Sequence, residues 1–133
     1  MENAALRVLV VDDERTVREN LKAYLEDEGF LVRAAESGEA ALALLDGEAF
    51  EVAIVDMRLP GIDGNAFILQ AHQRCPALRF LIHTGSSSYS IPQSLHEIGL
   101  AEANVFRKPI VDMNRMIEAM LACRVTREVP HER

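Results

Sequence analysis

The sequence has few cysteines, a deficit of basic residues and no long apolar segment. Cys75 and Cys123 lie far apart and form no Cys-x-x-Cys or Cys/His pattern, so we expect two reduced thiols and neither a zinc site nor a disulfide framework. Only 14 lysines and arginines stand against 21 aspartates and glutamates, and the net charge of −7 disfavours nucleic acid and anionic membrane surfaces as partners. No stretch approaches the roughly 20 apolar residues of a membrane-spanning helix, and the N-terminus does not resemble a signal peptide. We therefore expect a cytoplasmic protein with no membrane and no nucleic-acid partner.

The length of 133 residues suits one domain with its own core. Along it, short β-branched and leucine-rich runs alternate with segments of helical periodicity. The predicted strands are 6–11, 30–35, 52–55, 78–82 and 103–106, and the predicted helices are 14–28, 38–47, 65–74, 91–98 and 113–122. We expect the domain to span 1–123 and the polar, proline-containing tail, 124–133, to be frayed.

Strict alternation of strands and helices predicts an α/β fold. Right-handed crossovers then give a doubly wound parallel sheet with helices on both faces. Strands buried on both faces are expected to be apolar throughout, and the run VAIV at 52–55 fits this expectation.

Polar residues follow four of the five predicted strands. Asp12 and Asp13 end the first strand, Asp56 the third, Thr84 the fourth and Lys108 the fifth. Each alone fits an ordinary role, namely a helix cap at Asp13, a turn at Asp56, a loop cap at Thr84 or a solvated charge at Lys108. Because ligands bind at the carboxyl ends of strands in open α/β sheets, their joint occurrence at one edge favours a functional site.

Three carboxylates at one edge repel one another unless a cation lies among them. Mg²⁺ prefers oxygen ligands and is often held by one or two carboxylates with water and phosphate. A carboxylate beside such an ion can attack phosphorus, while a hydroxyl and an ammonium bind the phosphoryl oxygens. Asp56 is therefore the candidate phosphate acceptor, with Thr84 and Lys108 as its helpers.

Four motifs together resemble the receiver domain of two-component response regulators. They are VLVVDDE, VDMRLPGIDG, IHTG and FRKP, in this order, and the resemblance covers about residues 5–122. It implies a flavodoxin-like five-stranded sheet of order 2-1-3-4-5. It also implies that a phosphohistidine of a sensor histidine kinase or of a histidine phosphotransfer protein phosphorylates Asp56.

The resemblance also implies roles for the other residues at this edge. Asp12, Asp13, Asp56 and the backbone carbonyl of Met57 would hold Mg²⁺, directly or through water. Thr84 would bond to the phosphoryl group, and Lys108 would bridge it to the acids. The Lys108-Pro109 peptide bond would be cis. Arg58 and Ser86 lie beside the site, where the family varies the residues that tune the lifetime of the phosphoryl group.

A phosphoacceptor module implies protein partners. No linker or effector domain follows the last predicted helix, so the sequence resembles either a stand-alone receiver or a piece of a longer regulator. We expect a downstream protein to bind the face formed by the helix at 91–98, the strand at 103–106 and the helix at 113–122. Weak homodimerisation is a further form of association, and we expect no enzymatic activity beyond Mg²⁺-dependent self-phosphorylation and self-dephosphorylation at Asp56.

The sequence departs from the family at two places. Receivers commonly carry Tyr or Phe three residues before the lysine, where Val105 stands here, and the segment from Thr84 to Lys108 is a residue or two longer than usual. Alternation along a strand puts Val105 and Phe106 on opposite faces, so we expect Phe106 to be a core residue. Switching would then proceed through Thr84 and the loop at 85–90.

Two alternatives have a different function. A small Mg²⁺-dependent phosphohydrolase would also use an aspartate nucleophile, but its first acids normally read Asp-x-Asp, whereas Asp12 and Asp13 are adjacent. A pseudo-receiver would bind partners without being phosphorylated, and the retention of all five polar positions argues against it. His83, within an apolar strand, is expected to be packed in the core and not to be a ligand.

Overall fold

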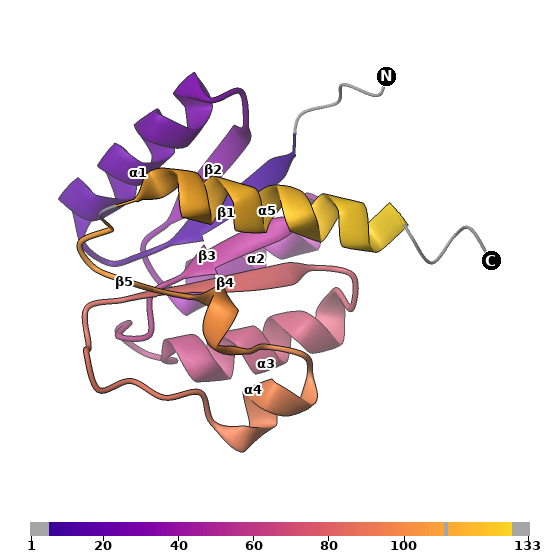
Figure 1. The fold of residues 1–133 in the computed structure, drawn as a ribbon. Coiled ribbons are helices and arrows are strands. Elements are labelled where there is room, and N and C mark those ends of the chain that lie inside the picture. The colour runs from indigo at the N-terminus through magenta and orange to yellow at the C-terminus, as the bar shows by residue number, and fades with distance from the viewer. Residues whose placement is uncertain (1–5, 111, 129–133) are drawn as a thin grey trace.

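The computed structural model describes the backbone of residues 6–110 and 112–128 and the side chains of these residues as far as Ala122. It contains one parallel five-stranded sheet of order β2-β1-β3-β4-β5, so the predicted fold and strand order are confirmed (Figure 1). The strands are β1 Arg7–Val11, β2 Leu31–Ala35, β3 Val52–Val55, β4 Arg79–Thr84 and β5 Val105–Arg107. The helices are α1 Arg15–Asp27, α2 Gly38–Gly47, α3 Gly64–Arg74, α4 Gln93–Glu97 and α5 Met113–Glu128, with a 3₁₀ turn, η1, at Glu102–Asn104.

Two apolar layers enclose the sheet, one on each face. Helices α1 and α5 cover one face, and α2, α3 and α4 cover the other (Figure 1). Strand β3 is buried throughout because it faces both layers: Val52 and Ile54 lie under α1 and α5, while Ala53 and Val55 lie under the other helices. We call these the α1/α5 layer and the α2/α3/α4 layer.

The same alternation holds in β5. Phe106 is 2% exposed and packs in the α1/α5 layer, whereas Val105 packs in the α2/α3/α4 layer. The guanidinium carbon of Arg115, on α5, lies 4.5 Å from the centre of the Phe106 ring. The prediction that Phe106 is a core residue on the face opposite Val105 is confirmed.

Helix boundaries follow caps and glycines. The Ser37 hydroxyl accepts a hydrogen bond from Ala40 N (3.1 Å) at the start of α2, and the Asp63 carboxylate caps α3 through Ala66 N (2.8 Å). Gly29 after α1 and Gly99 after α4 have φ of 99° and 106°, a conformation that residues with a Cβ rarely adopt.

The predictions were wrong at the ends of β4 and β5. Strand β4 continues past Ile82 because His83 and Thr84 pair with Phe106 and Arg107 of β5. Strand β5 begins at Val105, not at residue 103. The preceding residues form η1 instead, in which Asn104 Oδ1 accepts a hydrogen bond from Ala101 N (2.8 Å).

Helix α4 is shorter and α5 longer than predicted. Pro92 is the N-cap residue and precedes the first residue of α4, which ends after Glu97. Helix α5 runs to Glu128, so the predicted tail begins inside the helix, and residues 129–133 lie outside the described part of the chain. The sequence contains neither proline nor glycine from Met113 to Val129, and a helix can extend beyond its apolar stripe until such a breaker.

The remaining expectations concern membranes and cysteines. None of the helices in the described ranges is long and apolar enough to cross a bilayer. Cys75 is a free, half-buried thiol packed against the α2/α3/α4 layer, as predicted. The side chain of Cys123 lies outside the described residues.

Candidate phosphoacceptor site

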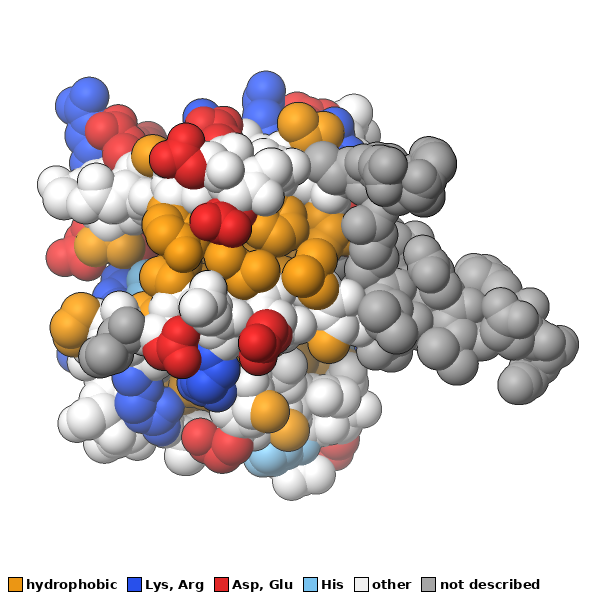
Figure 2. Space-filling view, turned by 45° about the horizontal axis from the view of Figure 1, so that its top comes forward, with side chains coloured by type: hydrophobic (Ala, Val, Ile, Leu, Met, Phe, Trp, Pro, Cys, Tyr) orange, Lys and Arg blue, Asp and Glu red, His pale blue; other side chains and the backbone are white. Residues whose placement is uncertain are grey.

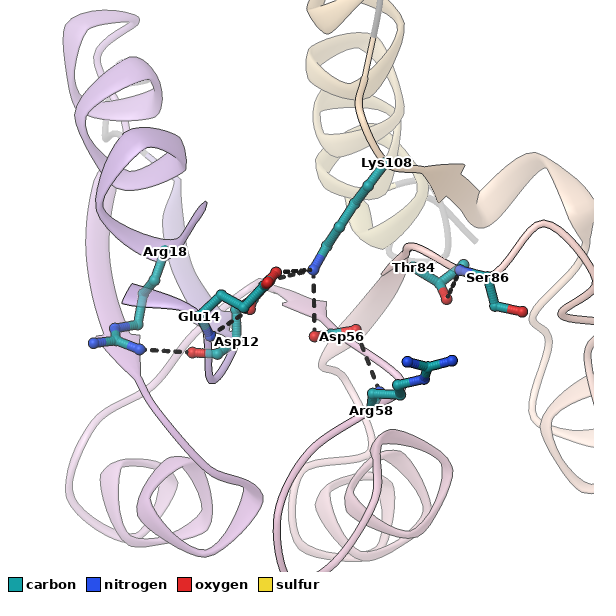
Figure 3. Close-up of polar contacts among 8 residues, drawn as sticks. All are labelled: Asp12, Glu14, Arg18, Asp56, Arg58, Thr84, Ser86 and Lys108. Atoms are coloured by element: carbon teal, nitrogen blue, oxygen red, sulfur yellow. Dashed lines mark hydrogen bonds and ion pairs between the residues drawn. The ribbon is translucent and has the colours of Figure 1, made fainter. Parts of the chain in front are cut away.

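Backbone hydrogen bonds extend the sheet beyond its strands and fix the acids at its carboxyl edge. Asp12 N donates to Ala35 O (3.1 Å) and Asp56 N donates to Val11 O (2.9 Å). On the other side of Asp56, Lys108 N donates to Thr84 O (2.7 Å). The ends of four strands, β1, β3, β4 and β5, therefore present side chains to one space, as the sequence predicted (Figure 3).

Lys108 lies between the acids of β1 and β3 (Figure 3). Its ammonium nitrogen is 3.0 Å from Asp12 Oδ2, 3.3 Å from Asp56 Oδ2 and 3.4 Å from Glu14 Oε1. The Lys108-Pro109 peptide bond is cis, as expected. Sequence reasoning did not find Glu14 as a partner of Lys108, although it directly follows the two aspartates.

The three aspartates form a compact cluster. Asp12 and Asp56 are buried, Asp13 is exposed, and one carboxylate oxygen from each lies within 4.8 Å of the others. Asp12 Oδ2 is buried and receives no well-aligned hydrogen bond from the described residues, so Lys108 meets it as a charge alone. A buried anionic oxygen of this kind suits a cation.

Burial and neighbouring charges set the protonation of the site. Burial and the negative charge of Asp12 raise the pKa of Asp56, although Lys108 and a hydrogen bond from Arg58 N act against the shift. Burial alone would lower the pKa of Lys108, but its close ion pairs with Asp12 and Asp56 and its hydrogen bond to Asp56 outweigh this and raise the pKa. Without another cation, the crowded carboxylates rely on Lys108 for charge compensation.

The structure shows only some of the ordinary roles that the sequence allows for the residues at this edge, such as capping a helix or a loop. Helix α1 is preceded by Glu14, whose side chain makes no capping bond, so Asp13 is not its cap. Asp56 Oδ1 accepts only a long hydrogen bond from Arg58 N (3.3 Å). Thr84 Oγ1 does cap its loop, because it accepts a hydrogen bond from Ser86 N (3.1 Å).

The loop after β3 carries the backbone carbonyl of Met57, the residue that follows Asp56. This carbonyl accepts a hydrogen bond from Gly64 N (3.1 Å) and keeps a second lone pair. Gly64 has to be glycine, because a Cβ there would collide with the backbone of Asp56 and Met57. Glu39 of α2 also holds the loop, since its carboxylate accepts a hydrogen bond from Ile62 N (3.1 Å).

A polar cavity of about 300 Å³ opens over the acids. It is lined by Asp13, Glu14, Asp56, Arg58, Thr84, Gly85, Ser86 and Lys108. Arg58 and Ser86, which the sequence placed beside the site, are therefore part of its wall. The cavity connects the carboxylates of Asp13 and Asp56 with the hydroxyl of Thr84 and with the ammonium of Lys108.

An apolar groove runs between α1 and α5 and ends at the site. Figure 2 shows hydrophobic side chains gathered between these two helices. The groove measures about 580 Å³, and Val17, Leu21 and Met113 line it, while Glu14 and Lys108 belong to both the groove and the polar cavity. His83 also lines it, is 6% exposed and has its pKa lowered to about 4 by burial and by Lys108, which confirms it as a packed histidine.

The family model described as the response regulator receiver domain matches residues 8–121. The chain belongs to the response regulator receiver family. The match includes every element from β1 to the larger part of α5 and all residues of the candidate site. It favours the receiver interpretation over the phosphohydrolase alternative.

Similar proteins include longer regulators. The receiver is 31% identical over 124 residues to an NtrX-like response regulator of Rickettsia felis, covering 92% of this chain and 26% of that protein. It is 28% identical over 116 residues to the transcriptional regulatory protein FixJ of Bradyrhizobium diazoefficiens, covering 86% of this chain and 56% of that protein. The chain thus spans between about a quarter and about half of the length of these relatives.

Solved receivers have the same fold. A CheY-like receiver domain protein of Methanospirillum hungatei superposes with a TM-score of 0.83 at 27% identity, covering 96% of this chain and 99% of that one. The response regulator TrrA of Thermotoga maritima, in complex with Mg²⁺-BeF, superposes with a TM-score of 0.76 at 27% identity, covering 89% and 98%. These likenesses confirm the CheY-like, flavodoxin-like class of the fold.

Proposed function

We propose that this receiver is a phosphoacceptor module in which the Asp56 carboxylate takes a phosphoryl group from a phosphohistidine of a partner. An Asp56 oxygen forms a bond to phosphorus, the bond from phosphorus to the histidine nitrogen breaks, and the imidazole leaves with the electron pair. The main support is the position of Asp56, buried beside Asp12 and Asp13 with the Lys108 ammonium 3.3 Å away.

The carboxylates suit a magnesium ion. Asp12, Asp13, Asp56 and the Met57 carbonyl would hold it, and the buried, unaligned Oδ2 of Asp12 fits a ligand role. The bound ion would supply positive charge next to the transferring phosphoryl group. This ligand set supports Mg²⁺ over zinc, because all of its donor atoms are oxygen.

Thr84 and Lys108 bind the phosphoryl oxygens once the group is on Asp56. The Lys108 ammonium already contacts Asp56 Oδ2 and can keep this contact while it pairs with a phosphoryl oxygen. The Thr84 hydroxyl accepts a bond from Ser86 N and keeps its own proton free to donate. Donation to the phosphoryl group would draw the loop after β4 toward Asp56.

The phosphodonor is a sensor histidine kinase or a histidine phosphotransfer protein. The groove between α1 and α5 supports docking of an amphipathic helix that carries the phosphohistidine, because its apolar floor leads to Glu14 and Lys108 at the site (Figure 2). The receiver acts as a signalling module in the cytoplasm. Its own chemistry is limited to self-phosphorylation from small phosphodonors and self-dephosphorylation at Asp56.

The output would be a change in affinity for a downstream protein at the face formed by α4, β5 and α5. Residues of this face include Arg107 and Arg115, which, with Pro109 and Ile110, line a depression of about 230 Å³. Weak homodimerisation through the same face is part of this proposal.

Incubation with acetyl phosphate and Mg²⁺, followed by intact mass measurement, tests the function. We expect one added phosphoryl group that is lost on acid treatment, that is absent when EDTA replaces Mg²⁺, and that is absent from Asp56→Asn. Asp46→Asn is the matched control, because Asp46 pairs with Arg74 on the surface, away from the site, and should leave labelling unchanged. Equal labelling of Asp56→Asn and the wild type would refute the assignment.

A further inference from the structure

We propose that Arg18 is a positioning residue for the metal site, because its guanidinium fixes the Asp12–Asp13 peptide and so directs the Asp13 carboxylate toward Asp12 and Asp56. This inference rests on the proposed Mg²⁺-dependent function. Nothing in the resemblance or in the sequence motifs assigned Arg18 a role.

One hydrogen bond carries the inference. Arg18 Nη1 donates to the backbone carbonyl oxygen of Asp12 over 2.8 Å, in a half-buried position. Figure 3 shows the side chain reaching back from α1 to this carbonyl. The carbonyl belongs to the peptide group that links the two acids, so the bond fixes the plane from which the Asp13 side chain departs.

In the turn between β1 and α1, other hydrogen bonds hold Asp12, whereas the Asp13 side chain depends on the peptide that Arg18 contacts. Asp12 is already held at its backbone nitrogen by Ala35 O (3.1 Å), and its Oδ1 accepts a hydrogen bond from Glu14 N (2.9 Å). Among the described residues, by contrast, no hydrogen bond or ion pair holds the exposed carboxylate of Asp13. Its place within 4.8 Å of Asp12 and Asp56 is therefore set through the backbone alone.

Arg18 does not contribute by its charge. A guanidinium near the acids repels a divalent cation, so charge alone would weaken the binding of Mg²⁺. Arg18 forms no ion pair with a carboxylate in the described part of the chain, although acidic residues are abundant. Geometry and charge thus predict opposite effects of its removal, and an experiment can separate them.

The test is a Mg²⁺ titration of the whole chain followed by the backbone amide NMR shifts of residues 12–14 and 56–58. Arg18→Met keeps the apolar stem and removes the donor and the charge. We expect its Mg²⁺ affinity to be about 3- to 10-fold lower, the range that loss of one half-buried hydrogen bond allows. Arg18→Lys keeps the charge and a donor and should restore most of the affinity.

Arg15→Met is the matched control for charge. Arg15 lies on the same helix, is exposed and pairs with Glu19 Oε2 (3.0 Å). We expect Arg15→Met to bind Mg²⁺ as tightly as the wild type or more tightly, and all variants to keep native amide dispersion in EDTA. Arg18→Gln takes the place of Arg18→Met if the latter does not fold.

Two results would overturn the inference and can be told apart. Unchanged or tighter Mg²⁺ binding in both Arg18→Met and Arg15→Met would show that Arg18 acts by charge only, while the proposed function would stand. If the wild-type amides at 12–14 and 56–58 do not respond to Mg²⁺, both the proposed function and the role of Arg18 are wrong.

Discussion

The two layers differ most where they approach Asp56. In the α1/α5 layer, Phe106 and His83 are buried, the Arg115 guanidinium stacks on the Phe106 ring, and Arg18 fastens the acidic turn. In the α2/α3/α4 layer, the corresponding β5 residue is the small Val105, and α4 has only five residues. The loop that joins β4 to α4 is fastened by Tyr89, whose hydroxyl donates to Asn65 Oδ1 (3.0 Å).

This difference indicates which part of the molecule responds to a phosphoryl group. The sheet holds the acids and Lys108, and Arg18 of the α1/α5 layer holds the turn at Asp12, so under the proposed function this side would be the template on which the phosphoryl group is placed. The loop at 85–92 follows Thr84, has exposed contacts such as the one between Ser86 and Ser88, and leads into the short α4. A pull on Thr84 would therefore move the α2/α3/α4 side.

The largest expected effect is the loss of stability when Phe106 is truncated, compared with the loss when Val105 of the other layer is truncated. Phe106→Ala should lower the free energy of unfolding by about 3–5 kcal/mol, the usual range for a buried phenylalanine. Val105→Ala removes two methyl groups and should cost about 2 kcal/mol. Urea unfolding at neutral pH measures both. Equal losses would show that the two layers are packed alike next to the site and would remove the basis of the comparison.

The protonation of His83 tests whether water reaches the α1/α5 layer near the site. Its pKa is about 4 in the folded protein, against 6.5 for an unburied histidine, so the unfolded chain binds the proton more readily between these values. The free energy of unfolding should therefore fall as the pH is lowered from about 7 to 4, by about 3 kcal/mol from this group.

Urea unfolding at pH 7 and pH 5 of the wild type and of His83→Leu isolates this contribution. The variant should lose less stability over this interval than the wild type. A pH dependence that His83→Leu leaves unchanged would mean that water reaches the imidazole.

The main features of the site could be predicted from the sequence because an apolar run leads to polar residues at the carboxyl end of each of these strands. Asp12 and Asp56 directly follow such runs, Thr84 comes one residue later, after His83, and the topology of a parallel sheet then brings them together. The opposite faces of Val105 and Phe106 follow from strand alternation. These features depend only on periodicity and on connectivity.

The contacts that fasten the site could not be predicted in this way. Arg18 reaches a carbonyl six residues earlier, and Tyr89 reaches Asn65 across 24 residues, so both contacts depend on loop conformations that no periodicity records. For the contact of Arg18, the sequence offers only the presence of an arginine in the first two turns of the helix that follows the acidic pair. For Tyr89 it offers only a lone aromatic residue within a serine-rich loop.

The smallest expected effect concerns the hydrogen bond between Tyr89 and Asn65 that holds the loop at 85–92. Tyr89→Phe removes one hydroxyl, and with it the bond to Asn65, while the Tyr89 carbonyl can still accept the bond from Arg107 Nη2 (2.9 Å). We expect a loss of about 1 kcal/mol in the free energy of unfolding. Because the lost bond restrains the loop in the unphosphorylated position, its removal should also shift the population of the loop toward the phosphorylated position.

Amide NMR distinguishes this shift from a simple loss of stability. Phosphorylation of the wild type should move the amides of residues 84–100 most, and Tyr89→Phe without phosphate should move the same amides part of the way in the same direction. Tyr24→Phe, at a half-exposed tyrosine of α1, is the matched control and should leave them in place. If the amides at 84–100 stay in place on phosphorylation while those around Phe106 rearrange, the α1/α5 layer carries the response and the template role assigned to it is wrong.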